Sequence, residues 1–427
     1  MDEELNQGRA AAVLALDIGS TVVKLARLDS QGGLASQDFY PRDFEVGVAA
    51  QVRHILDIHA IDPTVEPVLV CSSANGGLRV GIASLSPLFS GAALRNQVLL
   101  AGANPEYAHG FDDAQGDTRL VDVLLVGGGI DGEDAGPAAA QLESFDPSRY
   151  RYGTLVYCGN RYLAAAFARR FPQARIIDNP LGETLSSRVG SVFETIRRAY
   201  LDDLVFKEGV SELPYGLARS IRPTPEVASR GFLRSVNNQG SFTIVGTCLA
   251  LDIGGATTDL HYTVECVDED SPVRPSTGVS VARYVFTDLG IVASRDTLML
   301  QLRSHSQLYE LLSAVLGGQT REVYAALREG DYQPTPQLMA YACLFIALDR
   351  FAKGRGPGLP TGDLSKAAQI ILTGGAAQTL DEAVVGRMLG LLLPAGAPMP
   401  LVQVDRRYEI WVAGITWADD IAHAVAD

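Results

Sequence analysis

The sequence lacks the cysteine and histidine patterns that hold zinc or build a disulfide framework. Its five cysteines are odd in number, no two of them have CxxC spacing, and most lie inside apolar runs. The six histidines show no metal-ligand spacing with cysteines or acidic residues. A protein of a reducing compartment, with cysteines acting as small apolar residues, fits this pattern best.

Positive charge is also scarce. The 427 residues contain 35 Lys and Arg against 50 Asp and Glu, which gives a formal net charge of −15. No basic patch marks a nucleic-acid or anionic membrane surface, so neither is expected as a partner. A bound nucleotide would have to be held locally, by backbone N–H groups and a metal ion.

Long hydrophobic runs are missing as well. The longest uncharged stretch, at 389–404, is interrupted by proline and glycine and cannot span a bilayer. The first ten residues, MDEELNQGRA, are acidic and polar, unlike a secretory signal peptide. We therefore expect a cytoplasmic protein.

Short apolar runs that end in glycine-rich or small-residue turns are abundant. Most are followed by helix-like spacing, as after Asn160 and after Ala377. This alternation predicts an α/β protein with mainly parallel sheets, in which ligands bind at strand ends. The runs occupy 13–20, 67–77, 121–129, 154–160, 248–255 and 370–375.

One internal echo stands out. The segments 14–29 and 249–263 both carry an apolar strand into Asp-Ile-Gly and then into small hydroxyl residues. The echo predicts two domains of similar plan, at 1–182 and 241–427. Between them, 183–240 forms a connecting region that is mostly helical, with a break at Pro223 and Pro225.

The first Asp-Ile-Gly segment has the chemistry of a phosphate-binding loop. Gly19 lets the backbone turn tightly beneath a phosphate, and the hydroxyls of Ser20 and Thr21 can donate to its oxygens. Asp17 is expected to hold Mg²⁺ through water. Lys24 points either at phosphate or at solvent.

The second segment, 252–259, reads Asp-Ile-Gly-Gly-Ala-Thr-Thr-Asp. Its glycines allow close backbone approach, its threonines offer hydroxyls, and its two acidic residues can organise metal-bound water. A single Asp-x-Gly turn is weak evidence for a phosphate-binding loop. Two such turns, followed by ILTGGAAQ at 371–378, form a more specific pattern. The residues singled out for nucleotide binding here are Gly254, Gly255, Thr257, Thr258, Gly374 and Gly375.

These three loops resemble the actin-like superfamily of sugar kinases and heat-shock chaperones. The resemblance implies an α/β actin-like ATPase fold, with duplicated ribonuclease H-like domains flanking a nucleotide cleft. It implies a late helix starting at Gly414. It also implies a hinge acid within 175–187, either Asp178 or Glu183, although a helix start after Asn179-Pro180 explains that segment equally well.

A more specific resemblance is to the MutL family of glutamate mutase accessory proteins, which is unrelated to the mismatch-repair protein of that name. Six segments look like that family's segments in the same order, and together they cover most of the chain. They are 71–83, 121–134, 155–164, 221–232, 252–262 and 286–295.

The MutL resemblance implies an ATPase that uses ATP and Mg²⁺ to reactivate an adenosylcobalamin-dependent carbon-skeleton mutase such as glutamate mutase. Asp17, Asp252 and Asp259 are the catalytic candidates, and Asp17 and Asp252 would hold the metal through water. The sequence leaves the oligomeric state open. A small-molecule kinase and an actin-like assembly scaffold remain as alternatives.

Two middle segments have both functional and structural interpretations. The glycines at 127–129, before Asp131, form either a second small-ligand site or a structural turn between a strand and a helix. The polar cluster that includes Ser72 and Arg79 is explained by a turn with Asn-Gly-Gly at its tip.

Overall fold

The structure is a computed structural model, and it describes most of the chain. The described residues are 13–29, 32–43, 45–73, 78–87, 89–111, 113, 116–131, 135–181, 190–207, 212–213, 217, 221–240, 242–271, 280–356 and 358–416. The Asn-Gly-Gly turn near Ser73, part of the glycine-rich turn after Asp131 and Glu183 lie outside them.

The chain forms two compact units that exchange segments. The first unit takes its residues from Met1–Gly76, Leu201–Ile244 and Arg407–Asp427, and the second from Gly77–Tyr200 and Val245–Arg406. The chain therefore leaves and re-enters each unit. The three-part division at 182 and 240 stays a prediction.

The first unit is built on a mixed five-stranded sheet in the order β10-β4-β1-β2-β3. Strand β1 pairs antiparallel with β2 and parallel with β4. The hairpin of β1 and β2 therefore lies next to the parallel strands β4 and β10. Buried residues from β1, β2, β4, α7 and α13 form one apolar cluster beneath it. The elements are β1 (Leu14–Ile18), β2 (Val22–Leu28), β3 (Leu34–Pro41), α1 (Val48–Ile58), β4 (Val68–Ser72), β10 (Arg222–Pro223), α7 (Thr224–Val236) and α13 (Glu409–Ile415).

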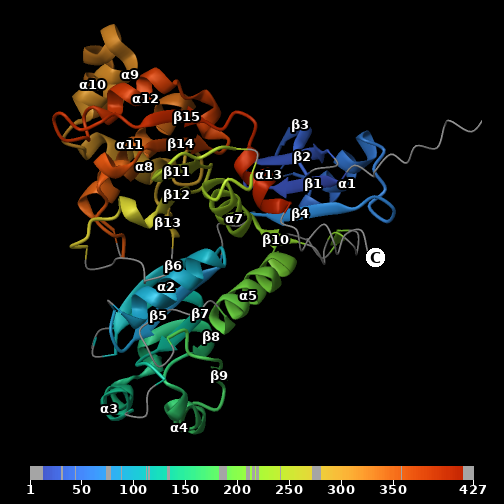
Figure 1. Cartoon of the computed structure of the whole chain (residues 1–427), viewed down its shortest axis with the longest axis vertical. Helices are drawn as coiled ribbons and strands as arrows, with labels where there is room; N and C mark the ends of the chain where they lie inside the picture. Colours follow the sequence, from blue (N-terminus) through green and yellow to red (C-terminus); the bar gives the residue numbers. More distant parts are fainter. Residues whose placement is uncertain are drawn as a thin grey trace, which may run out of the picture. The chain divides into compact units, whose positions relative to one another are not determined.

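A sheet of the same plan lies in the second unit, in the order β13-β12-β11-β14-β15. Strand β11 pairs antiparallel with β12 and parallel with β14. Helices α8 to α12 accompany it (Figure 1). The elements are β11 (Cys248–Ile253), β12 (Thr258–Thr263), β13 (Val281–Phe286), α8 (Arg295–Ser304), α9 (Leu308–Leu316), α10 (Thr320–Glu329), α11 (Pro336–Lys353), β14 (Gln369–Thr373), α12 (Glu382–Leu389) and β15 (Leu401–Val404).

The two sheets match strand for strand. Each runs as an antiparallel meander of three strands whose first strand then pairs in parallel with a fourth, and the fourth with a fifth. The predicted fold class, α/β with duplicated actin-like domains, is confirmed by this repeated strand order.

A third sheet belongs to the second unit and is parallel throughout, in the order β6-β5-β7-β8-β9. Counted along the chain, its strands stand second, first, third, fourth and fifth, an order typical of doubly wound sheets. Its elements are β5 (Arg79–Ser84), α2 (Ser90–Leu100), β6 (Asn104–Gly110), β7 (Asp117–Gly127), α3 (Gly136–Ser144), β8 (Tyr150–Tyr157), α4 (Ala164–Arg170) and β9 (Arg175–Ile176).

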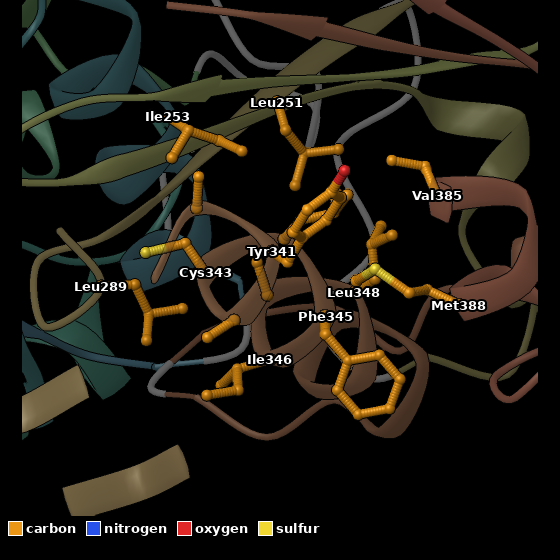
Figure 2. Packing of buried hydrophobic residues seen from close by; sticks show 14 of the residues in the cluster. Leu251, Ile253, Leu289, Tyr341, Cys343, Phe345, Ile346, Leu348, Val385 and Met388 are labelled. Atoms are coloured by element: carbon orange, nitrogen blue, oxygen red, sulfur yellow. The ribbon is translucent and has the colours of Figure 1, made fainter. Parts of the chain in front are cut away.

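Helix α11 lies in the apolar cluster that packs against the β11 sheet of the second unit. It begins with Thr335 as its N-cap, followed by Pro336, and ends at Gly354 in the left-handed conformation. Thirteen of its 18 residues are buried, so it is apolar on nearly all sides. Figure 2 shows Tyr341, Phe345 and Leu348 of this helix among Leu251, Ile253, Val385 and Met388. The helix therefore supports the strand that carries Asp252.

The predicted helical features are mostly confirmed. The segment after Asn160 forms a short 3₁₀ turn and α4, and the segment after Ala377 contains α12, which Asp381 caps by accepting from the Val384 N–H at 3.0 Å. In the connecting region, α5 (Ser191–Lys207) and α7 are helical, and the chain is extended at Arg222–Pro223. The break is thus confirmed at Pro223, whereas Pro225 lies in the first turn of α7, a position that proline tolerates.

The predicted helix start at Gly414 is wrong. Helix α13 begins at Glu409, so Gly414 lies near its described end. The glycine serves close packing instead. A Cβ on Gly414 would lie 1.8 Å from the carbonyl oxygen of Val227, and one on Gly231 would lie 1.7 Å from that of Ile410. Helices α7 and α13 therefore cross with their backbones in contact.

The five cysteines are free and buried, as the sequence predicts. Burial raises the pKa of the Cys343 thiol to about 12. Among the residues that the structure describes, no helix combines the length and the apolar character that a membrane span requires.

Candidate functional site

Two hairpin loops of the same geometry follow β1 and β11. In the first, the Gly19 N–H donates to the Val22 carbonyl at 3.0 Å; in the second, the Gly254 N–H donates to the Thr257 carbonyl at 2.9 Å. A Cβ on Gly19 would lie 2.6 Å from the Val22 oxygen, which explains the glycine there. The sequence echo is therefore also a structural echo.

Asp17 is buried at the end of β1 and already has several partners. Its carboxylate accepts from Lys24 Nζ at 2.7 Å, from Thr224 Oγ1 at 2.6 Å and from Cys71 Sγ at 3.3 Å, and the residue is 1% exposed. The Lys24 ammonium also lies over the Tyr408 ring, 4.7 Å from its centroid. Lys24 is thus paired with Asp17 and is not a solvated lysine.

Arg42 holds the first loop from its carbonyl side. Its guanidinium donates to the Gly19 carbonyl at 3.1 Å, and its backbone N–H donates to the Thr21 carbonyl at 2.9 Å. Ser20 and Thr21 are half-buried. Nothing in the spacing of Arg42 points to this contact, because two strands, β2 and β3, separate the residue from the loop.

The second hairpin pairs two carboxylates. Asp252 lies directly opposite Asp259 in the register of β11 and β12. Asp259 accepts from Arg283 Nε at 2.8 Å and also contacts Arg283 Nη2, and Thr257 Oγ1 donates to it at 3.3 Å. Arg283 is 3% exposed, and its Nη1 donates to the Leu99 carbonyl at 2.7 Å. The sequence analysis missed this arginine.

The predicted third loop meets the second at Asp252. Strand β14 runs parallel to β11 with Thr373 beside Asp252. The next residue, Gly374, has φ +89°, and a Cβ there would lie 2.1 Å from Asp252 Oδ1 and 2.9 Å from the Ile253 nitrogen. Gly374 is thus required by both its conformation and its neighbours. Gly375 has open space around it.

The segment 289–294, part of one of the family-like motifs, braces the second loop. Backbone N–H groups of Ile291, Val292 and Ala293 donate to the carbonyls of 254 and 255 at 2.7–3.3 Å. Ser294 Oγ donates to the Ala256 carbonyl at 2.7 Å. Within the described chain, no hydrogen bond is seen from the N–H of 255 or 256. The carbonyls of the loop are therefore occupied by the 289–294 segment, whereas two of its backbone N–H groups could donate to an anion.

Thr258 differs from the other residues singled out in this loop. It is fully buried, and its hydroxyl donates to the Leu289 carbonyl at 2.8 Å. Thr258 fixes the loop against the 289–294 segment, so we leave it out of the nucleotide-binding set proposed below.

The residues present fit a hydrated magnesium ion better than a fully protein-bound metal. In the described ranges, no group of three or more His, Cys, Asp or Glu could hold a metal ion. Asp252 and Asp259 supply two neighbouring carboxylates. Mg²⁺ usually keeps several waters and takes one or two carboxylates plus phosphate oxygens, which matches such a pair.

The remaining candidates lie on the parallel sheet. Asp178 is exposed and follows the edge strand β9, and its carbonyl accepts from Ser191 Oγ at 3.0 Å. A Cβ on Gly127 would lie 2.5 Å from Leu94 Cδ1, and one on Gly128 would lie 2.8 Å from Leu85 Cβ. Packing therefore explains Gly127 and Gly128, and the left-handed φ of +73° explains Gly129.

Comparison with known proteins gives a family match over almost the whole chain. A family model described as MutL protein matches residues 13–424. Protein MutL of Clostridium tetanomorphum is 25% identical over 265 residues, which cover 58% of this chain and 57% of that protein. The aligned part of the chain thus spans little more than half the length of this relative.

Solved structures of low sequence identity also align along the chain. The activator of the 2-hydroxyisocaproyl-CoA dehydratase from Clostridium difficile with bound ADPNP is 10% identical with a TM-score of 0.36, covering 97% of this chain and 96% of that one. Component A of the (R)-2-hydroxyglutaryl-CoA dehydratase of Acidaminococcus fermentans is 10% identical with a TM-score of 0.34, covering 97% and 100%.

Proposed function

Because the chain belongs to the MutL protein family, we propose that it binds and hydrolyses ATP and serves as an accessory protein. Its proposed partner is an adenosylcobalamin-dependent carbon-skeleton mutase such as glutamate mutase. The observation that carries the nucleotide part is the Asp252 loop, where Gly374 of the late glycine loop lies directly against the carboxylate. The mutase part rests on the family.

Each described loop residue has a defined task in this proposal. The N–H groups of Gly255 and Ala256 donate to phosphate oxygens, and Gly254 keeps the turn open to a phosphate. Asp252 and Asp259 orient water bound to Mg²⁺, and Mg²⁺ when bound spreads the negative charge of the phosphates. The ion pair with Arg283 fixes the Asp259 carboxylate for this role.

Asp17 has a different position in the proposal. Its charge is balanced by Lys24 and its second oxygen is held by Thr224. We therefore assign it to shaping the first loop and to water-mediated contact with the metal. Ser20 and Thr21 remain the donors to phosphate on this side.

The proposed service to a mutase is the exchange of a damaged cobalamin for an intact one. A ligand shifts a conformational equilibrium only when it binds one state better than the other. ATP and ADP differ by the γ-phosphate, so contacts from the loops to that group would give the two nucleotide states different affinities for the mutase.

The nucleotide part is tested by calorimetry and by an ATPase assay. We expect magnesium-dependent binding of ATP by the wild-type chain. Asp252→Asn should lower hydrolysis by about 10- to 100-fold, as expected for a residue acting on a metal through water, with unchanged circular dichroism. Asp270→Asn, at an exposed site, is the matched control. Absence of magnesium-dependent nucleotide binding by the wild type would remove the ATPase proposal.

The mutase part needs its own assay. A mutase inactivated with cyanocobalamin is incubated with this protein and adenosylcobalamin, in the presence of ATP, of ADP or of neither. We expect the mutase to recover its activity only in the arm that contains ATP. Equal recovery in all three arms would remove the reactivation proposal and leave the ATPase proposal standing. Phosphorylated metabolites detected by mass spectrometry would instead support the kinase alternative.

A further inference from the structure

Helix α8 and the segment after α10 form a small pocket on the second unit, with a volume of about 330 Å³. The residues that line it come from 295–303 and 332–333, and none belongs to the loops at 252–259 or 374–375. Arg295, Met299 and Arg303 lie four residues apart along α8, so they share one face of the helix. The pocket thus has an apolar residue between two arginines.

The guanidinium of Arg303 is the first reason to expect an anion here. Its Nε is buried, and in the part of the chain that the structure describes the guanidinium forms no hydrogen bond or ion pair. The residue as a whole is half-buried and lines the pocket. A cation that has lost water without gaining an acceptor gains more free energy from a bound anion than a fully hydrated cation does.

Arg295 has no acidic partner either, among the residues that the structure describes. Its Nη2 donates to the side-chain oxygen of Gln333 at 3.0 Å, which is a neutral group. Asp296 is the one acid among the described lining residues, and it is exposed and pairs with neither arginine. The pocket is therefore locally basic, on a chain whose formal net charge is −15.

Apolar surface continues outside the pocket. Met299 is 7% exposed, whereas the next residue, Leu300, is 68% exposed and also lines the pocket. Tyr332 adds a half-buried ring on the other wall. Arginine, methionine and tyrosine are residue types enriched at protein interfaces. A ligand that filled only the pocket, which is near the lower limit of small-molecule sites, would leave much of Leu300 in water.

The spacing of the two arginines suits an extended chain. Eight residues of α-helix rise about 12 Å, which is the distance between Arg295 and Arg303 along the axis of α8. In an extended strand, residues i and i+4 are about 13 Å apart, and residue i+2 between them faces the same way. Carboxylates at i and i+4 therefore match the two arginines, and an apolar side chain at i+2 matches Met299 and Leu300.

We propose that this face of α8 binds an extended acidic segment of a partner protein. Its carboxylates pair with Arg295 and Arg303, and its apolar side chain packs on Met299 and Leu300. Arg303 is the anchor, because a guanidinium presents parallel N–H donors to a carboxylate, and arginines are frequent among the residues that dominate the binding free energy of interfaces. The proposal depends on neither the nucleotide loops nor the mutase.

Fluorescence anisotropy with the full chain tests the proposal. The probe is a labelled peptide with the core Glu-Ser-Leu-Ser-Glu, and the comparison peptides carry Gln-Ser-Leu-Ser-Gln and Glu-Ser-Ser-Ser-Glu. We expect the first peptide to bind more tightly than either comparison peptide, and Arg303→Ala to weaken its binding by about 10-fold or more. Arg169→Ala removes an exposed positive charge from α4 of the same unit and should leave the binding unchanged.

Leu300→Ser provides a second variant at an exposed position, where the fold is not at risk. It should weaken binding of the peptide with leucine and leave binding of Glu-Ser-Ser-Ser-Glu unchanged. Three outcomes would overturn the proposal. They are no binding of the probe by the wild type, equal binding of the probe by the wild type and either Arg303→Ala or Leu300→Ser, and displacement of the probe by an equal concentration of glutarate, which would indicate a small-molecule site.

Discussion

Lys24 and Asp259 occupy the same position in two matching hairpins and carry opposite charges. Lys24 lies opposite Asp17 in register and is paired with it at 2.7 Å, whereas Asp259 lies opposite Asp252. Like charges directly opposite one another destabilise a strand pair. The first loop is thus neutralised by its own hairpin. The second has a carboxylate pair, balanced at Asp259 by Arg283, and is the better place for a hydrated cation.

The Lys24 pair gives the first prediction. Lys24→Met should leave the Asp17 carboxylate buried without its cation, which costs about 3–5 kcal/mol when a buried pair is broken. Both tryptophans of the chain lie in segment 407–427 of the first unit, so urea unfolding followed by tryptophan fluorescence reports on that unit. Lys366→Met, at an exposed position, is the control. An unchanged midpoint for Lys24→Met would contradict the structure.

Two adjacent glycines in the late loop give a matched pair of variants. Gly374→Ala would force a side chain into a left-handed position 2.1 Å from Asp252 Oδ1, and should weaken magnesium-dependent ATP binding at least 10-fold by displacing that carboxylate. Gly375→Ala meets nothing within 4 Å and should bind ATP as the wild type does. Equal effects of the two changes would show that Gly374 does not position Asp252.

The crossing of α7 and α13 predicts a strong dependence on helix glycines. Gly231→Ala would place a Cβ 1.7 Å from the Ile410 carbonyl oxygen, so the helices must separate, and overpacking of this kind costs about 1–3 kcal/mol or more. Gly386→Ala in α12 meets nothing within 4 Å and should stabilise its helix by up to about 1 kcal/mol. The free energy of unfolding is measured by urea denaturation, followed by tryptophan fluorescence for Gly231→Ala and by circular dichroism for Gly386→Ala. A stabilising Gly231→Ala would rule out the tight crossing.

His261 predicts a pH dependence of stability. Burial, aided by the charge of Arg283, lowers its pKa to about 3, whereas an unfolded histidine titrates near 6.5. The unfolded chain therefore binds one more proton between these values, and the free energy of unfolding falls as the pH drops from about 6.5 towards 3. His261→Gln should flatten the slope by up to about 1.4 kcal/mol per pH unit. Urea titrations of the two proteins between pH 7.5 and 5 measure the difference, and identical slopes would contradict it.

The two matching hairpin loops could be located from sequence because the residues that form them are neighbours in the chain. Asp, Gly and the following small residues lie within one turn, and the echo between 14–29 and 249–263 marks both hairpins. The glycine at 374 was found for the same reason. Its contact with Asp252 follows from the parallel pairing of β14 with β11.

Partners that are distant along the chain could not be predicted in this way. Thr224 donates to Asp17 across 207 positions, and Arg283 and Arg42 carry no local signal of their contacts. The separate parallel sheet was missed for a related reason. Its strands have the same apolar runs and glycine turns as the others, and periodicity indicates a strand without indicating which sheet the strand joins.

The interleaving of the chain also has a consequence for biosynthesis. The apolar cluster of the first unit joins Ala26 and Leu69 to Val227, and then to Trp411 and Ile415 of α13. A ribosome adds roughly 5–20 residues per second, so strands β1 to β4 emerge early and then wait while more than three hundred further residues are made. The last segment of the second unit, which ends at Arg406, is synthesised before the last segment of the first unit, Arg407–Asp427. We therefore expect the nascent chain to complete the second unit first, and to depend on holding chaperones for the exposed face of the first sheet until α13 arrives.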